Sequence, residues 1–433
     1  GLADAVAICE DDEVDELGIV DGLADLADKS MVEVQPDLRG GEYRLLETMK
    51  AFGADNSARR NETASLRSRH AGHYTALAAD LQRDLIGPDE LGIRNRGRLA
   101  AADLRAALDW VATTRDLPSL VSLSRSLIWF IYCGWMDPAR WIDAAATETE
   151  EGIPGFAESA AFAVLILDGD PDRALAQLAP LRAEDPLDLD FLGLFTVVVS
   201  SLLAGEPQHG LPAAERMLAV GDASNNPAER AFSAFGLANL KAILGEPDED
   251  LARHFLEAAE REQSATARSY ALSTGSRMFF HADEDLAVDM LERARDLAVS
   301  VDSHDALANA LLQLLSPNID RLPLEEAALE ASTTLAMMEQ LGNTAVQRSA
   351  LGLAQVVSQR LERYELASVI SGHLDDRRQP VTPAEQERYD DSVTELKRAV
   401  DPNTLETLRA RGEALSTREV AKQVSRALRE TQT

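Results

Sequence analysis

The sequence predicts a mainly all-α protein, an α-solenoid of paired helices that carries a small winged-helix segment with a short β-hairpin. Three observations predict this class. Hydrophobic residues make up 45% of the 433 residues but aromatic residues only 5%, a composition that suits many helix–helix contacts between small side chains. Strand-like alternation is confined to residues 30–45. Finally, a similar glycine-containing turn recurs at Gly169, Gly205 and Gly245, which are 36 and 40 residues apart.

The N-terminal segment, residues 1–57, has the element order of a winged-helix domain. Apolar residues recur at helical spacing in residues 2–10 and 14–28. Two short strands follow, at 30–35 and 42–45, separated by a turn rich in glycine and proline. A third helix begins directly after the second strand. The order helix, helix, strand, turn, strand, helix therefore predicts a winged-helix domain here.

The rest of the chain is predicted to be helical and built from repeats. Each glycine of the recurring turn is followed by an acidic residue and a proline, as at Gly169, Gly205 and Gly245. The period is that of stacked helical hairpins such as tetratricopeptide-like repeats. One hairpin cannot bury its apolar face alone, so the hairpins must stack. The predicted segments are linker helices at 58–98, a tetratricopeptide-like array at 99–400 and a C-terminal helical cap at 401–433.

Residues suited to helix capping mark several of the predicted helix starts. Thr382 and Ser416 each precede a glutamate by three residues, the spacing of a capping box. Asn226 is followed by a proline, which favours the first helical position. These positions fix the ends of the predicted hairpins independently of the glycine turns.

Charge and composition exclude several classes of function. The formal net charge is −32, whereas general nucleic-acid binding requires clustered Lys and Arg. Two distant cysteines, Cys9 and Cys133, provide neither a disulfide framework nor a zinc site. No apolar run approaches the ~20 residues that span a bilayer, and the N-terminus lacks a signal-peptide pattern. We therefore expect a cytoplasmic protein with no membrane partner.

Five stretches of the chain carry a resemblance to a known family. Residues 23–32 and 43–52 resemble the winged helix that follows the nucleotide-binding module in bacterial signal-transduction ATPases with numerous domains. These are actinobacterial regulators of the AfsR/LuxR-like type, some of them linked to adenylate cyclase domains. Residues 67–74, 104–110 and 409–416 look like further helical elements of the same family. The match in the winged helix is fairly specific, whereas the repeats are generic.

The resemblance implies that the chain is the C-terminal winged-helix and helical region of such a regulator. The implied partners are an upstream nucleotide-binding module of the same polypeptide and a protein or small-molecule effector bound by the repeats. The chain begins at Gly1 within a helix-like pattern, so we expect the polypeptide to continue upstream. The parent protein would be an NTPase or nucleotide cyclase through those upstream domains.

The sequence departs from the family pattern in two ways. No G-x-x-x-x-G-K-[ST] motif occurs, so the phosphate-binding loop is absent from these residues. Many relatives begin the helix after the wing with Met-His-Asp, where this chain has Leu45, Leu46 and Glu47. A leucine cannot donate a hydrogen bond to a phosphate, which puts nucleotide sensing by this helix in doubt. We accordingly expect no cofactor in this chain.

One region of this acidic chain is rich in arginine. It is either a seam that docks the nucleotide-binding module or an acidic partner, or a set of internal salt bridges to the acidic repeats. The second interpretation is favoured, because surface charge clusters usually have no dedicated partner. The candidate docking residues are Arg59, Arg60, Arg67, Arg69, Arg94, Arg96 and Arg98.

Three other groups of residues have both a functional and a structural interpretation. His70 and His73 share a helical face, but no third metal ligand has suitable spacing. The acidic run at residues 11–16 could hold paired carboxylates, yet acids also stabilise a helix start. An aromatic cluster at residues 129–141 could line a ligand groove or form core. The structural interpretation is favoured in each case, so no metal site is predicted.

No catalytic motif is visible, and no nucleophile lies in a G-x-S-x-G turn. The leading hypothesis is therefore a non-enzymatic regulatory scaffold that senses a ligand through its repeats. The alternatives are a passive oligomerisation or interaction module, and an enzyme with a site that the sequence does not reveal. Acidic residues in the segment 15–28 would repel phosphates, so the winged helix is predicted to dock within the molecule and not to contact nucleic acid.

Overall fold

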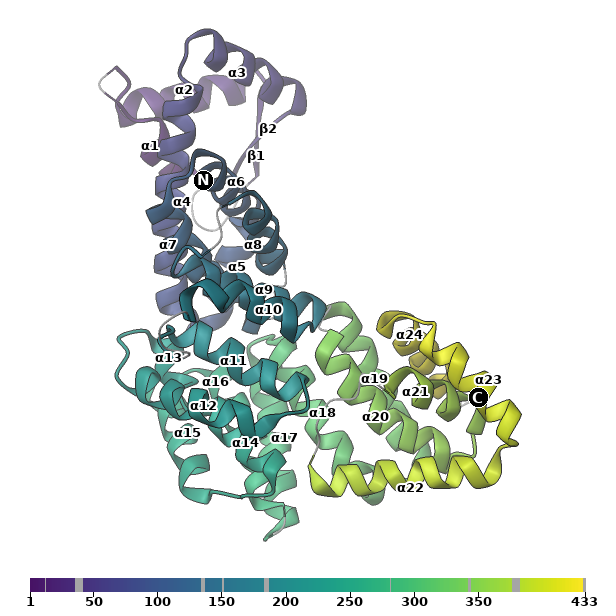
Figure 1. Ribbon diagram of the computed structural model, residues 1–433. Coiled ribbons are helices and arrows are strands. Elements are labelled where there is room, and N and C mark those ends of the chain that lie inside the picture. Colours follow the sequence, from purple (N-terminus) through teal and green to yellow (C-terminus); the bar gives the residue numbers. More distant parts are fainter. Residues whose placement is uncertain are drawn as a thin grey trace. The chain divides into compact units, whose positions relative to one another are not determined.

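The structure, a computed structural model, describes residues 1–11, 13–35, 42–133, 137–149, 152–182, 187–280, 282–341, 344–375 and 382–430. Almost all of these residues are helical, and one antiparallel hairpin near the N-terminus supplies the strands seen in them (Figure 1). The predicted all-α class with a small N-terminal hairpin is confirmed.

The described chain forms two compact units. Unit 1 comprises residues 1–80 and 97–123, and unit 2 comprises residues 81–96 and 124–433. The four segments expected from the sequence were defined by pattern and not by packing, and their boundaries stay a prediction.

Unit 1 has the predicted order of elements. Its first helix, hairpin and third helix begin within two residues of the expected positions. The elements are α1 (Leu2–Cys9), α2 (Glu16–Asp28), β1 (Val32–Gln35), β2 (Glu42–Leu45), α3 (Glu47–Arg59), α6 (Ala101–Thr114) and parts of α4 (Thr63–Leu85), α5 (Glu90–Leu99) and α7 (Leu117–Ile128).

The hairpin is short and the head of unit 1 buries little. Strands β1 and β2 pair so that Val32 lies opposite Leu45 and Val34 lies opposite Tyr43. Between residues 1 and 59 the described buried side chains are Ile19 and Val32. The apolar residues of this head are therefore mostly on its surface.

Unit 2 consists of successive helices that pack against their sequence neighbours, as Figure 1 shows for α11 with α12 and α19 with α20. Its elements, beside the remainder of α4, α5 and α7, are η1 (Trp129–Cys133), α8 (Asp137–Glu148), α9 (Phe156–Asp168), α10 (Pro171–Leu178), η2 (Ala179–Arg182), α11 (Phe191–Leu203), α12 (Pro207–Asp222), α13 (Pro227–Ala231), α14 (Phe235–Leu244), α15 (Glu249–Arg261), α16 (Ala265–Phe279), α17 (Glu284–Ser300), α18 (His304–Arg321), α19 (Leu324–Leu341), α20 (Thr344–Arg360), α21 (Tyr364–Leu374), α22 (Pro383–Ala399), α23 (Pro402–Glu413) and α24 (Thr417–Arg429).

The recurring turns lie where the sequence places them. Gly169, Gly205 and Gly245 end or follow α9, α11 and α14 with φ of 62°, 79° and 72°. This left-handed conformation strains most side chains but not glycine, which explains why glycine recurs. Gly342, which also follows an apolar stretch, lies outside the described residues.

The predicted helix starts are confirmed at atomic detail. The side chains of Thr382 and Ser416 accept hydrogen bonds from the backbone N–H groups of Glu385 and Glu419. In return, each glutamate carboxylate accepts a hydrogen bond from the backbone N–H of the cap residue. Asn226 accepts from Ala228 N. These bonds satisfy donors that a helix start leaves unpaired.

An aromatic column runs through the helices of unit 2. The ring of Trp129 lies 5.9 Å from that of Phe191, and Phe191 continues to Phe195 at 6.4 Å. Phe195 then meets Phe235 edge to face at 5.6 Å, and Phe235 meets Tyr270 in the same way at 5.7 Å. Because the rings come from η1, α11, α14 and α16 in turn, with Phe191 and Phe195 both on α11, the column joins successive elements of the array.

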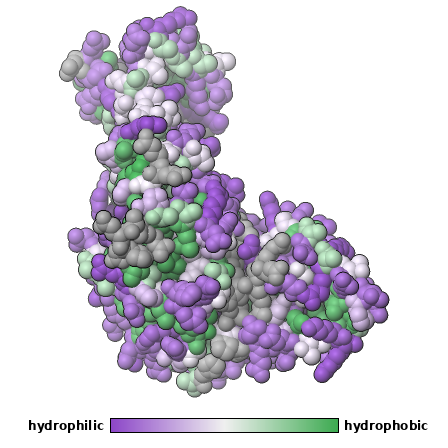
Figure 2. Space-filling model, viewed as in Figure 1, coloured by the Kyte–Doolittle hydropathy of each residue, from purple (hydrophilic) through white to green (hydrophobic). Residues whose placement is uncertain are grey.

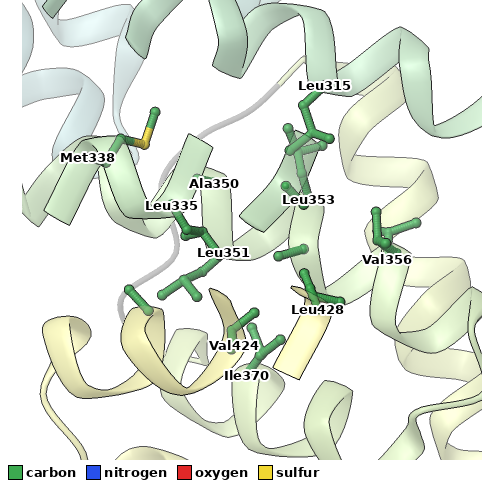
Figure 3. Close-up of a cluster of buried hydrophobic side chains, with 14 of the residues drawn as sticks. Leu315, Leu335, Met338, Ala350, Leu351, Leu353, Val356, Ile370, Val424 and Leu428 are labelled. Carbon is green, nitrogen blue, oxygen red and sulfur yellow. The ribbon is translucent and has the colours of Figure 1, made fainter. Parts of the chain in front are cut away.

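The C-terminal helices share a second core (Figure 3). Leu335 and Met338 from α19, Leu351 from α20, Ile370 from α21 and Val424 from α24 converge there. Helix α24 thus covers apolar surface that α19 and α20 would otherwise expose, as a capping helix must. Figure 2 shows that the outer surface in view is mainly hydrophilic, in keeping with the acidic composition.

Helices α21 and α23 approach each other closely through two glycines. A Cβ on Gly372 would overlap the backbone of Arg409, and a Cβ on Gly412 would overlap the carbonyl oxygen of Val369. The crossing therefore requires glycine on both helices. Gly352, within α20, has nothing within 4 Å of such a Cβ.

Gly412→Ala should destabilise unit 2 by at least about 2 kcal/mol, because backbone atoms of two helices would have to separate. Gly352→Ala is the matched control and should stabilise by up to about 1 kcal/mol, since alanine favours a helix interior. Chemical denaturation of both variants measures the difference. Equal effects would contradict the close crossing.

Candidate functional site

Unit 2 encloses a cavity because distant helices of the array meet. Helix α9 contacts α20, and η1 contacts α18, although long stretches of chain separate the members of each pair. The space between them has a volume of about 230 Å³. Side chains from η1, α9, α11, α14, α16, α18, α19, α20 and α22 line it.

The cavity wall is mostly apolar. One side is formed by rings of the aromatic column, where Phe162 stacks on Phe195 at 5.3 Å and Phe195 continues to Phe235 and Tyr270. Aliphatic side chains complete the wall; they include Leu165, Val199, Leu202, Leu312, Met338, Leu341 and Leu353. An apolar cavity with few polar groups is the usual form of a small-molecule site.

The first polar group of the cavity is a carboxylate. Asp305, in the first turn of α18, accepts a hydrogen bond from the Tyr270 hydroxyl of α16. Loss of solvent raises the pKa of the Asp305 carboxyl to about 6, and the Tyr270 hydrogen bond only partly offsets this. The cavity therefore holds an acid that is costly to ionise in the absence of a partner.

The second polar group is an arginine that already has partners. Arg277 of α16 donates to Asn239 Oδ1 at 3.2 Å, and its guanidinium lies 4.0 Å from the Glu385 carboxylate. Both charged side chains are nearly nine-tenths buried. Glu385 also completes the capping box of α22. Burial lowers the pKa of Arg277, with Glu385 opposing this effect.

A neighbouring cavity of about 220 Å³ shares this polar boundary. Arg277, Gln313 and Glu385 line both spaces, whereas Arg388 and Asp320 line the second one only. The Arg277–Glu385 pair thus borders both spaces.

The structure places four of the predicted docking arginines in the first 80 residues, within unit 1. Arg59 pairs with Asp55 at 2.6 Å on the surface of α3, and Arg60 lies 3.9 Å from a glutamate. Arg67 lies over the Trp110 ring at 5.4 Å. Arg69 donates to the carbonyl oxygen of Glu10 at 2.9 Å. These contacts all lie within unit 1, and a docking role for the seam stays a prediction.

The other three arginines lie on α5. Arg94 is fully buried in unit 2, where it donates to Val301 O and lies 3.8 Å from Glu90. Arg94 therefore makes its contacts inside unit 2 and is not part of an exposed surface. Arg96 and Arg98 are exposed.

Glu90 anchors the same helix to the array. Its carboxylate accepts hydrogen bonds from Ser264 Oγ at 2.5 Å and from Thr266 N at 3.1 Å. Burial raises the pKa of Glu90, although the Ser264 and Thr266 hydrogen bonds oppose this. The Glu90 carboxylate of α5 thus accepts hydrogen bonds from donors at the N-terminus of α16, and both groups are paired.

The histidines and the acidic run have structural partners. His70 lies 3.1 Å from Asp103 and His73 lies 2.8 Å from Asp4, so the two rings face different carboxylates. Asp15 caps α2 by accepting from Gly18 N. Within the described residues, no group of three or more potential metal ligands occurs. Asp12 of the acidic run lies outside them.

The aromatic cluster of residues 129–141 is core where it is described. Trp129, Phe130 and Trp141 are buried, and Trp129 begins the aromatic column. Trp135 and the side chain of Tyr132 lie outside the described residues. The three buried rings do not line the cavity, whereas Ile131 of the same stretch does.

The polar cavity residues Asn239, Arg277 and Asp305 were not predicted from the sequence. One signal was available: Arg277 is the single charged residue between Ser269 and Phe280, a stretch that is otherwise apolar or small. A lone charge on a buried helix indicates a partner or a ligand. Asp305 gives no such signal, because acids are common in the first turn of a helix.

Comparison with known proteins gives a partial relationship. No family model matches the chain. Over 146 residues it is 31% identical to proteins named "Putative HTH-type transcriptional regulator" from Mycobacterium tuberculosis (strains H37Rv and CDC 1551) and Mycobacterium bovis. The chain is distantly related to these regulators. The match covers 33% of this chain and 16% of each relative.

The relationship agrees with the resemblance that the sequence motifs suggested at the level of transcriptional regulators. The relatives are much longer than the matched region, so activities of the whole proteins are not carried over. Among the described helices, none is long and apolar enough to cross a membrane.

Asp305→Asn tests the cost of the cavity carboxylate. The pKa is raised from 3.8 to about 6 on folding, so the folded state binds more protons between these values and stability falls as pH rises through that window. Asparagine cannot ionise. The stability of the variant relative to the wild type should therefore rise by up to about 3 kcal/mol from pH 4 to pH 7. Denaturant unfolding measures it, and a pH-independent difference would contradict the buried ionisation.

Proposed function

We propose that the chain is the regulatory region of a multidomain signal-transduction ATPase or transcriptional regulator, and that it senses a small molecule in the cavity of unit 2. The observation that carries this proposal is the cavity itself, with its aromatic wall and its polar groups at Asp305 and Arg277. The partial relationship to transcriptional regulators supports the regulatory context. In this proposal the chain acts by binding and not by catalysis, and holds no cofactor.

Because of the position of the cavity, a bound molecule would influence how the helices of the array are arranged. The cavity is lined by side chains of eight α-helices and of η1, and it lies where α9 meets α20. A ligand there would favour the closed arrangement of these helices over any more open one, because only the closed arrangement offers all contacts at once. Such differential contact is what shifts a conformational equilibrium.

The head of unit 1 is proposed to dock the upstream nucleotide-binding module of the same polypeptide. Several apolar side chains of the head are exposed, with Leu17 at 72% and Phe52 at 63%. Val34, Leu45 and Leu46 of the same head are also exposed. So many exposed apolar side chains on a small segment favour an interaction site. Direct nucleic-acid binding is not proposed, since α2 carries Asp21, Asp25 and Asp28.

Ala308→Leu tests the cavity as a ligand site. Ala308 is buried and lines the cavity, so a larger side chain would occupy the space. The wild type should bind the neutral probe 4-phenylbutan-1-ol, measured by calorimetry, and the variant should bind at least about tenfold more weakly. Leu286→Ala, an exposed change on α17, is the control. Failure of the wild type to bind this probe or its charged analogues would favour a passive interaction module.

Leu17→Gln with Phe52→Gln tests the docking face. Both side chains are exposed, so the double variant should unfold within about 0.5 kcal/mol of the wild type. It should lose co-purification with the nucleotide-binding module of the parent polypeptide. Leu99→Gln, equally exposed at 64%, should retain it. Retention by the double variant would contradict docking through this face.

A further inference from the structure

The charged groups of the cavity do not cancel. Three charged side chains line it: Arg277, Asp305 and Glu385. Arg277 and Glu385 face each other at 4.0 Å, and Arg277 also donates to Asn239. Among the described residues, no cationic side chain forms an ion pair with Asp305. The charge left over in the cavity is therefore negative and belongs to Asp305.

The carboxylate of Asp305 has one oxygen directed to a protein donor. Its Oδ2 accepts from the Tyr270 hydroxyl, and no hydrogen bond to Oδ1 is seen within the described part of the chain. Oδ1 is also not one of the fully buried polar atoms that lack a hydrogen-bond partner. A carboxylate oxygen can accept two hydrogen bonds. Oδ1 is thus an available acceptor on a residue that lines the cavity.

Aromatic rings lead up to this carboxylate. Tyr270 meets Phe235 edge to face at 5.7 Å, and Phe235 meets Phe195 at 5.6 Å; all three line the cavity beside Asp305. Ring faces attract cations, and desolvation strengthens that attraction. A carboxylate next to aromatic rings is a combination suited to an ammonium group.

A purely structural role for Asp305 explains less. Acids are favourable in the first turn of a helix, and Asp305 is in the first turn of α18. Its side chain, however, bonds across to Tyr270 of α16 and not to the backbone at the start of its own helix. Ser303 occupies the N-cap position of this helix, and its side chain makes no cap hydrogen bond.

We infer that the ligand of the cavity is a small amphipathic amine, whose ammonium group donates to Asp305 beside Tyr270 and whose apolar body lies against Phe195 and Phe235. This inference rests on the proposed function and specifies its ligand class. The volume of about 230 Å³ is below the roughly 300 Å³ at which ligand pockets usually begin, so the apolar body is compact. The net charge of −32 would attract such a cation to the protein.

Three probes with one body separate the head groups: 4-phenylbutylamine, 4-phenylbutan-1-ol and 4-phenylbutyrate. Calorimetric titration at about 0.15 M salt, where charges are screened beyond about 8 Å, removes most long-range attraction. The amine should bind the wild type at least about tenfold more tightly than the alcohol, as a charge-assisted hydrogen bond requires. The carboxylate probe should bind most weakly.

Asp305→Asn keeps the shape of the side chain and removes its charge. It should reduce amine affinity to that of the alcohol while changing alcohol affinity less than about threefold. Asp302→Asn is the matched control: Asp302 pairs with His304, does not line the cavity, and has a φ of 53° that asparagine tolerates. It should keep the amine preference.

Tyr270→Phe provides a second variant should Asp305→Asn fold poorly. It leaves the carboxylate and removes its hydroxyl donor, so the amine preference should persist. An amine that binds no better than the alcohol, or a preference that survives Asp305→Asn, overturns the inference. Alcohol binding that Ala308→Leu abolishes, without amine preference, would leave the proposed function standing. Absence of binding by all three probes would overturn both.

Discussion

The inability of a helical hairpin to bury its own apolar face is the constraint on which unit 2 depends. The solution seen here is the aromatic column from Trp129 to Tyr270, whose rings are supplied by η1, α11, α14 and α16. In a chain with so few aromatic residues, this concentration means that one set of contacts holds successive hairpins in register. The outer surface needs only to be polar, and it can carry the high negative charge.

The cavity follows from the same constraint. Rings that join neighbouring hairpins also form a wall on the inner side, and the contact of α9 with α20 closes the space beyond it. Packing of this kind favours apolar residues at every inner position. Asp305 and Arg277 depart from that rule, and such departures are where function is expected, because burying charge costs free energy. Arg277 is paired with the oppositely charged Glu385, whereas Asp305 accepts a hydrogen bond from Tyr270 and lines the cavity.

Much of the fold was predictable because it is determined by residues that lie close together in the sequence. The glycines at Gly169, Gly205 and Gly245 mark left-handed turns, and Thr382 and Ser416 mark helix starts, each through backbone bonds within a few residues. The cavity was not predictable, because it depends on which distant helices meet. Arg94 shows the same limit. The arginines near it in the sequence suggested an exposed docking seam, but Arg94 is buried where it donates to Val301, a residue far away in the sequence.

The most direct test of the account is hydrogen exchange, followed by mass spectrometry, with and without 4-phenylbutylamine. The account predicts slower exchange in α14, α16 and α18, whose side chains line the cavity, and unchanged exchange in α23 and α24, which do not contribute to it. Protection centred on α23 and α24, or no protection at saturating amine, would contradict the claim that the cavity of unit 2 is the ligand site.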